Sequence, residues 1–255
     1  LKFSGLILGV RLLDTINTWP DAISRFLTSQ PFATQILVTL AFSVVGALFL
    51  SVALGLIIAY THSQEKGSTP RPRTNIPPFL WGIALGAAVA GISAAVSALT
   101  PSLAPRWPSY APASAYIPLL GMGLESLTKT LVYTTLFLLI FLAAHQFTQN
   151  WTRRKTVTGL LWIFMGIVIS GSLDLTTVPQ WIVASLITGA VLFLAYWLVF
   201  RYALFLVPLA VGTLMIMGDI REALLQPYLA AIPGVVFSAL GVGLVSYGWS
   251  KTLKS

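Results

Sequence analysis

The strongest constraint on the fold is one uncharged apolar run of 29 residues, from Phe32 to Tyr60. A helix needs about 20 apolar residues to cross the hydrocarbon core of a bilayer, so this run predicts a membrane-spanning helix. The whole chain of 255 residues shares this character, being 56% hydrophobic and only 9% charged. A soluble domain carries about a quarter charged residues. The composition therefore argues against a soluble enzyme, a disordered chain or a nucleic-acid-binding domain, and it predicts contact with a lipid bilayer.

Further apolar runs predict an all-α, polytopic membrane bundle that forms a single domain over residues 1–255. With 32–60, the predicted spans are 79–99, 119–147, 157–173, 180–200, 203–218 and 232–249. Residues 1–13 could form a partial span, which gives a total of seven to eight transmembrane helices. Residues 14–31 are amphipathic and predict a short interfacial helix, with Thr18 as its N-cap and Pro20 in its first turn.

Two local patterns predict how the helices pack. Gly82 and Gly86 form a GxxxG pair in a span rich in glycine, alanine and serine. Small residues let a neighbouring helix approach closely, so this span is expected inside the bundle. Pro208 lies within a predicted span and should kink it.

The net charge of +8 is useful mainly through its distribution along the chain. When the predicted spans are assigned to alternate sides, ten basic residues fall on one side and four on the other, with Lys129 inside a span. The ten are Lys2, Lys66, Arg71, Arg73, Arg153, Arg154, Lys155, Arg201, Lys251 and Lys254, and the four are Arg11, Arg25, Arg106 and Arg221. The positive-inside rule then predicts a bacterial-type inner-membrane protein with a cytoplasmic C-terminus.

Glu125 and Lys129 are the ionisable residues placed inside a predicted span. Their i,i+4 spacing puts them on one helix face, where they can form a salt bridge. Such residues are candidates for a proton or ion site, or for contact with a substrate headgroup. The alternative is a neutralised pair near the outer interface, with Lys129 extending toward the headgroups. Ser126, Thr128, Thr130, Thr134 and Thr135 make the same helix unusually rich in hydroxyl groups.

His62 and His145 are the only histidines, and both lie at the cytoplasmic ends of predicted spans. Two imidazoles at one membrane depth could ligate a haem or a chlorophyll if their helices face each other. The alternative is that both are ordinary interfacial polar residues.

Two charged groups are predicted outside the hydrocarbon core. Asp219, Arg221 and Glu222 form an outer cluster, which could be an external ligand site or a capped turn with an arginine–carboxylate pair. Arg153, Arg154 and Lys155 could contact anionic lipid headgroups and also serve as a topology signal.

The chain lacks the sequence motifs of the common catalytic sites. HExxH, Walker A, GxSxG and GxGxxG are all absent, and there is no cysteine for a thiolate metal site or a disulfide. The sequence therefore predicts no catalytic residues, requires no cofactor and favours a protein that is not an enzyme.

Two stretches resemble the membrane regions of long bacterial proteins in the CAAX-protease and bacteriocin-processing family. They are WTRRK at Trp151–Lys155 and FRYALFLVPLAVGTLMIMGDIREALLQPY at Phe200–Tyr228, in the second half of the chain. The metal site of that family uses an EExxxR motif, an FxxxH motif and a further histidine. Here only FxxxH is present, at Phe141–His145. The resemblance implies a non-catalytic region, or a part of a chain whose active site lies elsewhere.

Three functions are consistent with these patterns. The first is a non-catalytic integral subunit or membrane domain of a larger assembly, with other membrane subunits as partners. The second is a transporter or channel with its polar site at Glu125 and Lys129. The third is a pigment- or haem-binding subunit that uses His62 or His145.

Overall fold

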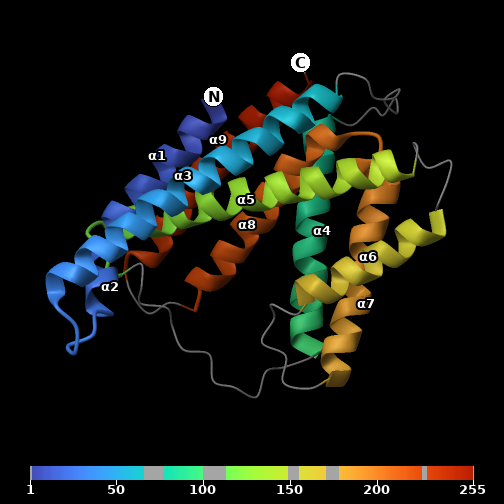
Figure 1. Cartoon of the computed structure of the whole chain (residues 1–255). Coiled ribbons are helices and arrows are strands. Elements are labelled where there is room, and N and C mark those ends of the chain that lie inside the picture. Colours follow the sequence, from blue (N-terminus) through green and yellow to red (C-terminus); the bar gives the residue numbers. More distant parts are fainter. Residues whose placement is uncertain are drawn as a thin grey trace.

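A computed structural model describes residues 2–65, 77–99, 113–148, 155–170, 178–225 and 229–254, which contain helices and no strand (Figure 1). The helices, in chain order, are α1 (Lys2–Asn17), α2 (Trp19–Ser24), α3 (Phe32–Glu65), α4 (Pro78–Leu99), α5 (Pro118–Phe147), α6 (Lys155–Ser170), α7 (Val178–Ala195), α8 (Val207–Ala223) and α9 (Ala231–Lys254). A π-helix, η1 (Tyr196–Phe200), continues α7, and a 3₁₀ turn, η2 (Leu204–Leu206), precedes α8.

Six of these helices are long and apolar enough to cross a membrane, namely α3, α4, α5, α7 with η1, η2 with α8, and α9. The chain is therefore described as an all-helical, multi-pass membrane protein. The predicted span 157–173 corresponds to α6, whose apolar part is the shorter Val157–Val168. The region of the predicted partial span belongs to α1, which has 16 residues. The predicted total of seven to eight spans thus remains a prediction.

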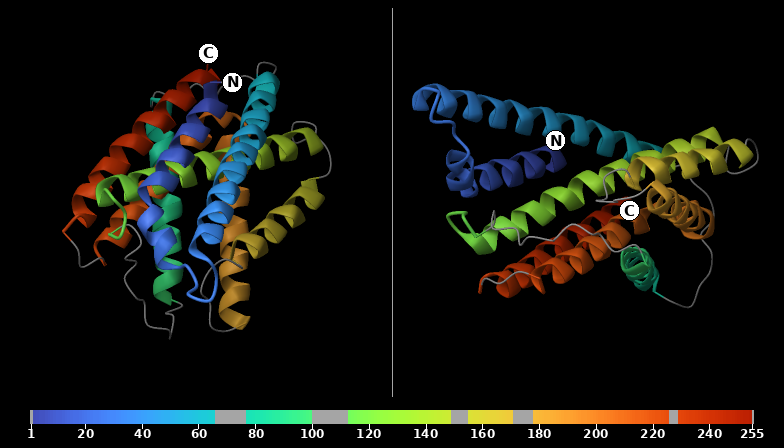
Figure 2. Two further views of the ribbon diagram at one scale, coloured as in Figure 1. Left: turned by 60° about the vertical axis from the view of Figure 1, so that its left-hand side comes forward. Right: turned by 90° about the horizontal axis from the view of Figure 1, so that it is seen from below.

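The bundle is layered around α5. In the right-hand view of Figure 2, α1 and α3 lie on one side of α5, while α8 and α9 lie on the other. Helices α4, α6 and α7 stand beside this stack, where α4 contacts α8 and α6 contacts α7. Both chain ends lie at the same end of the bundle. This arrangement makes α5 the helix whose side chains can meet groups from α1, α8 and α9.

Glycines allow close approach at two helix contacts, α4 with α8 and α6 with α7. A Cβ added to Gly86 of α4 would lie 2.4 Å from the backbone oxygen of Ala210 in α8, and one added to Gly82 would lie 2.7 Å from Leu209 Cβ. The close approach expected for the GxxxG pair is therefore present. Helix α4 as a whole does not lie inside the bundle. Among the residues of α4 whose burial is described, only Gly82 and Gly86 are buried. A second close contact joins α6 to α7, where a Cβ added to Gly166 would lie 2.3 Å from the backbone oxygen of Ser185.

Pro208 stands where η2 meets α8, within the candidate span Leu204–Ala223, and the kink expected there stays a prediction. The proline lies in the first turn of α8, after η2. The first turn of a helix has no partner for its backbone N–H groups, so a proline there costs no hydrogen bond. The candidate span here is Leu204–Ala223, which begins one residue later than the predicted span 203–218 and ends five residues later.

The N-terminal region also differs from the predicted interfacial helix 14–31. Helix α1 continues to Asn17, and only the six residues of α2 follow as a separate helix. Thr18 stands at the N-cap position with Pro20 in the first turn, but its hydroxyl donates to the Asp14 carbonyl oxygen at 2.7 Å. The hydroxyl thus bonds back to α1 and does not cap α2.

Candidate functional site

Glu125 and Lys129 form an ion pair on α5. Lys129 Nζ lies 2.7 Å from Glu125 Oε1, and the two side chains are 50% and 48% exposed. They stand seven and eleven residues from Pro118, which is about 10 and 16 Å along the helix axis. The pair is therefore inside a candidate membrane span, yet neither charge is buried in protein.

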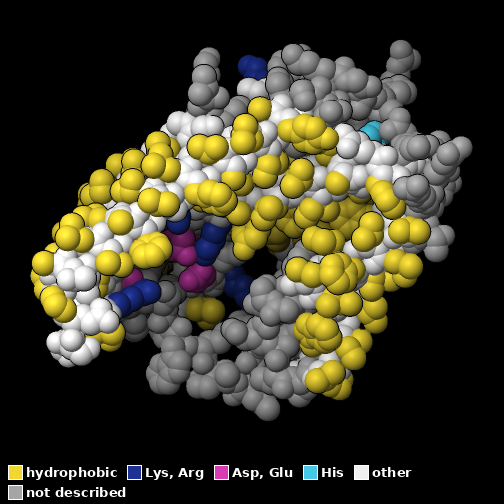
Figure 3. Space-filling view, viewed as in Figure 1, with side chains coloured by type: hydrophobic (Ala, Val, Ile, Leu, Met, Phe, Trp, Pro, Cys, Tyr) yellow, Lys and Arg dark blue, Asp and Glu magenta, His cyan; other side chains and the backbone are white. Residues whose placement is uncertain are grey.

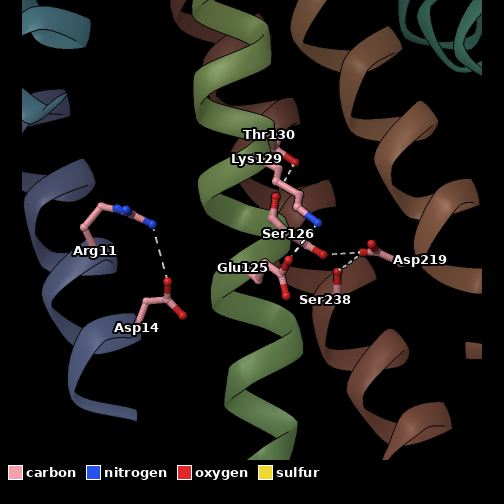
Figure 4. Close-up of polar contacts among 8 residues, drawn as sticks. All are labelled: Arg11, Asp14, Glu125, Ser126, Lys129, Thr130, Asp219 and Ser238. Carbon is pink, nitrogen blue, oxygen red and sulfur yellow. Dashed lines mark hydrogen bonds and ion pairs between the residues drawn. The ribbon is translucent and has the colours of Figure 1, made fainter. Parts of the chain in front are cut away.

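A second ion pair faces the first from α1. Arg11 Nη1 lies 3.5 Å from Asp14 Oδ2, with Asp14 the more buried partner. The Asp14 carboxyl points from α1 toward α5 (Figure 4), and its charge interacts with that of Glu125. Sequence reasoning missed this pair because it placed Arg11 and Asp14 at the outer surface. Their i,i+3 spacing on one helix was the available signal.

Asp219 of α8 reaches the same place from the opposite side of α5. Its Oδ2 accepts hydrogen bonds from Ser126 Oγ of α5 at 2.6 Å and from Ser238 Oγ of α9 at 2.5 Å (Figure 4). The charge of Lys129 also interacts with those of Asp219 and Glu222. One carboxylate thus joins three helices through two buried hydroxyl groups.

The outer cluster of Asp219, Arg221 and Glu222 differs from the predicted capped turn with an arginine–carboxylate pair. All three residues belong to the last turns of α8, and within the described part of the chain none forms an ion pair. Residues one or two apart on a helix do not face each other, which explains why Arg221 does not pair with its neighbours.

A row of hydroxyl groups continues along α5 from the Asp219 contact. Ser126, Thr130 and Thr134 follow one another at four-residue spacing and are at most 5% exposed. Thr130 donates to the Ser126 carbonyl oxygen at 2.8 Å. Thr134 has no hydrogen-bond partner among the described residues, and neither has Ser246 of α9. The hydroxyl-rich helix predicted from the sequence therefore turns many of these groups into the bundle.

The charged side chains gather in a hollow of an otherwise apolar face. Figure 3 shows basic and acidic groups together below α3 and α5, with hydrophobic side chains above them. Large apolar residues are exposed all along α3, including Phe42 and Phe49 at 76% each, as expected for a surface that meets lipid. On the face shown in Figure 3, acidic groups of the described residues thus lie in and beside one hollow, together with several basic groups.

The histidines lie on neighbouring helices at one end of the bundle. Helices α3 and α5 are joined there by a hydrogen bond between Tyr60 and Gln146, residues close to His62 and His145 in the sequence. His145 is half-buried, whereas the side chain of His62 lies outside the described residues. Phe141, from the FxxxH string, is 1% exposed in an aromatic cluster with Trp162, Tyr196 and Phe200. Haem or chlorophyll binding remains a prediction.

Within the described ranges, no group of three or more His, Asp or Glu side chains could hold a metal ion. Arg153 and Arg154, and the side chain of Lys155, lie outside the described residues, so their predicted contact with lipid headgroups stays a prediction.

Asn17 is a structural residue that sequence reasoning did not identify. Its Nδ2 donates to the Ile117 oxygen at 3.0 Å, and its Oδ1 accepts from the Ile117 N–H at 2.8 Å. This 6% exposed amide joins the end of α1 to the residue before α5. It therefore fixes the relative position of the two helices that carry the ion pairs.

The chain matches no protein-family model, and comparisons with curated proteins and with solved structures find no significant match.

Proposed function

We propose that this multi-pass membrane protein is a transporter or channel, with Glu125 and Lys129 at the mouth of its pathway. The observation that carries the proposal is the half-exposed state of both charges inside a span. Charged groups that face hydrocarbon are costly, and in known proteins they almost always line the bundle interior or a water-filled cavity. We infer that water fills the hollow in which Figure 3 shows the charged groups, which would make it such a cavity.

The pair also suggests the class of solute. It presents a carboxylate and an ammonium group only 2.7 Å apart, each about half accessible. A small zwitterion, such as an amino acid, carries one charge of each sign and could pair with both. An exposed ion pair contributes about 0–1 kcal/mol, so a solute could open it at little cost.

Uptake by proteoliposomes tests this proposal. The probe is a mixture of radiolabelled amino acids, and empty liposomes give the background. We expect uptake with the native chain and loss of it when Glu125→Gln is combined with Lys129→Met. Asp21→Asn with Arg25→Met is the matched control, because that i,i+4 pair, at 2.6 Å on α2, lies outside the candidate spans. Native uptake at background level, or unchanged uptake by the α5 variant, would contradict the proposal.

A second candidate is a non-catalytic membrane subunit, as the resemblance to the CAAX-protease and bacteriocin-processing family also suggests. The supporting observation is the run Gly91–Ala95 of α4, whose five residues are all small or apolar and all exposed. Small residues permit close approach of another helix. Purification in mild detergent tests this function, which requires a co-purifying membrane protein; a lone chain would contradict it.

We also propose the orientation predicted from the basic residues, in a bacterial-type inner membrane with the C-terminus in the cytoplasm. Because the chain has no cysteine, single cysteines can be introduced without removing others. Thr252→Cys in α9 should be protected from an impermeant maleimide in intact cells, while Leu229→Cys, 98% exposed before α9, should react. The reverse labelling pattern would invert the orientation.

A further inference from the structure

Asp219 differs from the other carboxylates of the site in how it is held. Asp14 and Glu125 each pair with a basic side chain on their own helix. Asp219 instead accepts two hydrogen bonds on one oxygen, from Ser126 and Ser238. Both serines are buried, at 5% and 1% exposed, whereas Asp219 itself is only partly buried. Oxygen atoms from α5, α8 and α9 therefore converge at one point that solvent can reach.

We propose that Asp219, Ser126 and Ser238 form a binding site for a small monovalent cation such as Na⁺. Carboxylate and hydroxyl oxygens suit hard cations. A serine oxygen has two acceptor lone pairs and a hydroxyl hydrogen that can rotate. The hydroxyls that donate to the carboxylate in the absence of an ion can thus turn their lone pairs toward a bound cation. Water from the open side of Asp219 would complete the coordination.

The local charge favours one positive ion of single charge. The outer parts of α1, α5 and α8 carry four carboxylates against three basic side chains: Asp14, Glu125, Asp219 and Glu222 against Arg11, Lys129 and Arg221. One negative charge is left over. Protein sites for Ca²⁺ offer six to eight oxygen ligands with several carboxylates, whereas this site offers one carboxylate from the described residues. A monovalent cation matches both the surplus charge and the ligand set.

Two further buried hydroxyls lie eight residues beyond the two serines on α5 and α9, which is about 12 Å further along each helix. Thr134 and Ser246 are 0% and 3% exposed and have no hydrogen-bond partner among the described residues. They stand 16 and 15 residues from the starts of α5 and α9, about 24 and 22 Å along each helix. A buried hydroxyl without a partner costs about 1–3 kcal/mol, so water or an ion is expected to satisfy it. The hydroxyl row thus continues inward from the Asp219 site.

This inference deepens the proposed function, because a cation beside the Glu125–Lys129 pair could be coupled to solute movement, but binding can be tested alone. The native chain in lipid nanodiscs is unfolded by heat in NaCl, KCl or choline chloride at equal ionic strength. Tryptophan fluorescence reports the transition. We expect a saturable rise in Tm with NaCl that choline does not reproduce and that K⁺ reproduces only weakly.

Variants locate the site. Asp219→Asn should abolish the response to Na⁺. Ser126→Ala and Ser238→Ala should each raise the half-saturating Na⁺ concentration at least about tenfold, as when a group supporting a metal ligand is lost. The matched control is Ser185→Ala on α7, a 2% exposed serine bonded to the Trp181 oxygen at 2.7 Å, which should keep the native response. If Asp219→Asn does not fold, the two serine variants decide.

The cation site would be overturned by the absence of a Na⁺ response in the native chain, by an equal rise with choline, by a native response in Asp219→Asn, or by unchanged half-saturation in both serine variants. A rise that follows pH without Na⁺ would also overturn it and would indicate a proton site. Glu125→Gln with Lys129→Met should keep the Na⁺ response while losing uptake. Uptake without a Na⁺ response rejects the cation site alone, and a Na⁺ response without uptake by the native chain rejects the proposed transport alone.

Discussion

The docking of α4 onto α8 should depend on Gly86, because α4 has so little other buried surface. Gly82 and Gly86 are the only buried residues among the described side chains of this helix. A Cβ at Gly86 would lie 2.4 Å from the Ala210 oxygen and 2.7 Å from Thr213 Cβ, whereas ordinary contacts are 3.4–4 Å. The backbone of Ala210 cannot rotate away as a side chain could. Gly86→Ala therefore requires α4 to move outward by about 1 Å.

The energetic cost follows from two opposing terms. Overpacking of this kind costs about 1–3 kcal/mol. Alanine is favoured over glycine inside a helix by about 1 kcal/mol in water. We expect Gly86→Ala to lower the free energy of unfolding by up to about 2 kcal/mol. The matched control is Gly91→Ala on the same helix, where an added Cβ meets nothing within 4 Å. It should leave the free energy of unfolding unchanged or raise it by up to about 1 kcal/mol.

Titration with SDS in mixed micelles, followed by far-ultraviolet circular dichroism, measures both variants against the native chain. A difference of 1.4 kcal/mol is about tenfold in the unfolding equilibrium constant, so the two alanine variants should be clearly separated. Equal stability of Gly86→Ala and Gly91→Ala would refute the idea that close backbone approach holds α4 in place. A loss of stability in both would indicate that helix flexibility, and not the α4–α8 contact, is what the glycines provide.

Two further predictions concern other contacts of the bundle. Asn17→Ala should lower the free energy of unfolding by about 1–3 kcal/mol, since it removes two part-buried hydrogen bonds, one to the N–H and one to the C=O of Ile117. An unchanged midpoint of thermal unfolding would contradict this reading. Gly166→Ala should weaken α6–α7 packing by about 1–3 kcal/mol, because the added Cβ would lie 2.3 Å from a backbone oxygen. The control is Gly159→Ala on the same helix, whose added Cβ meets nothing within 4 Å. Crosslinking between cysteines placed on α6 and α7 should fall only in the Gly166 variant, and equal crosslinking in both would reject the packing argument.

The sequence predicted much of the fold because long apolar runs have a single solution in a membrane. Backbone groups in hydrocarbon must be satisfied within the segment, so each long run becomes a helix. The run 32–60 is contained in α3, and 119–147 coincides with α5 to within one residue. The sequence does not decide whether the short apolar runs cross the membrane. Helix α6, with 16 residues, falls near the length needed to span the hydrocarbon core. Local chemistry decided the beginning of α8, where Pro208 stands in the first turn and not in the interior.

The candidate site was only half visible in the sequence. Glu125 and Lys129 could be paired from their spacing, because an i,i+4 contact is local. The bond from Ser126 to Asp219 joins residues 93 positions apart and depends on which helices become neighbours. Alternation along the chain places both residues at the same end of the bundle but does not make them face each other. Asp219 was for this reason assigned to an outer turn, when it is bonded to both α5 and α9.

The same contacts suggest why fold and function are difficult to separate in this part of the bundle. Removing Asp219 would leave two buried serine hydroxyls without their acceptor, which costs stability whatever the site binds. The serines provide the better separation, because Ser126→Ala and Ser238→Ala each delete one donor and leave the carboxylate its other partner and its open side. A structural role predicts a loss of stability that is independent of Na⁺. A binding role predicts that the loss grows as the Na⁺ concentration rises, because the native chain alone gains full stabilisation from the ion.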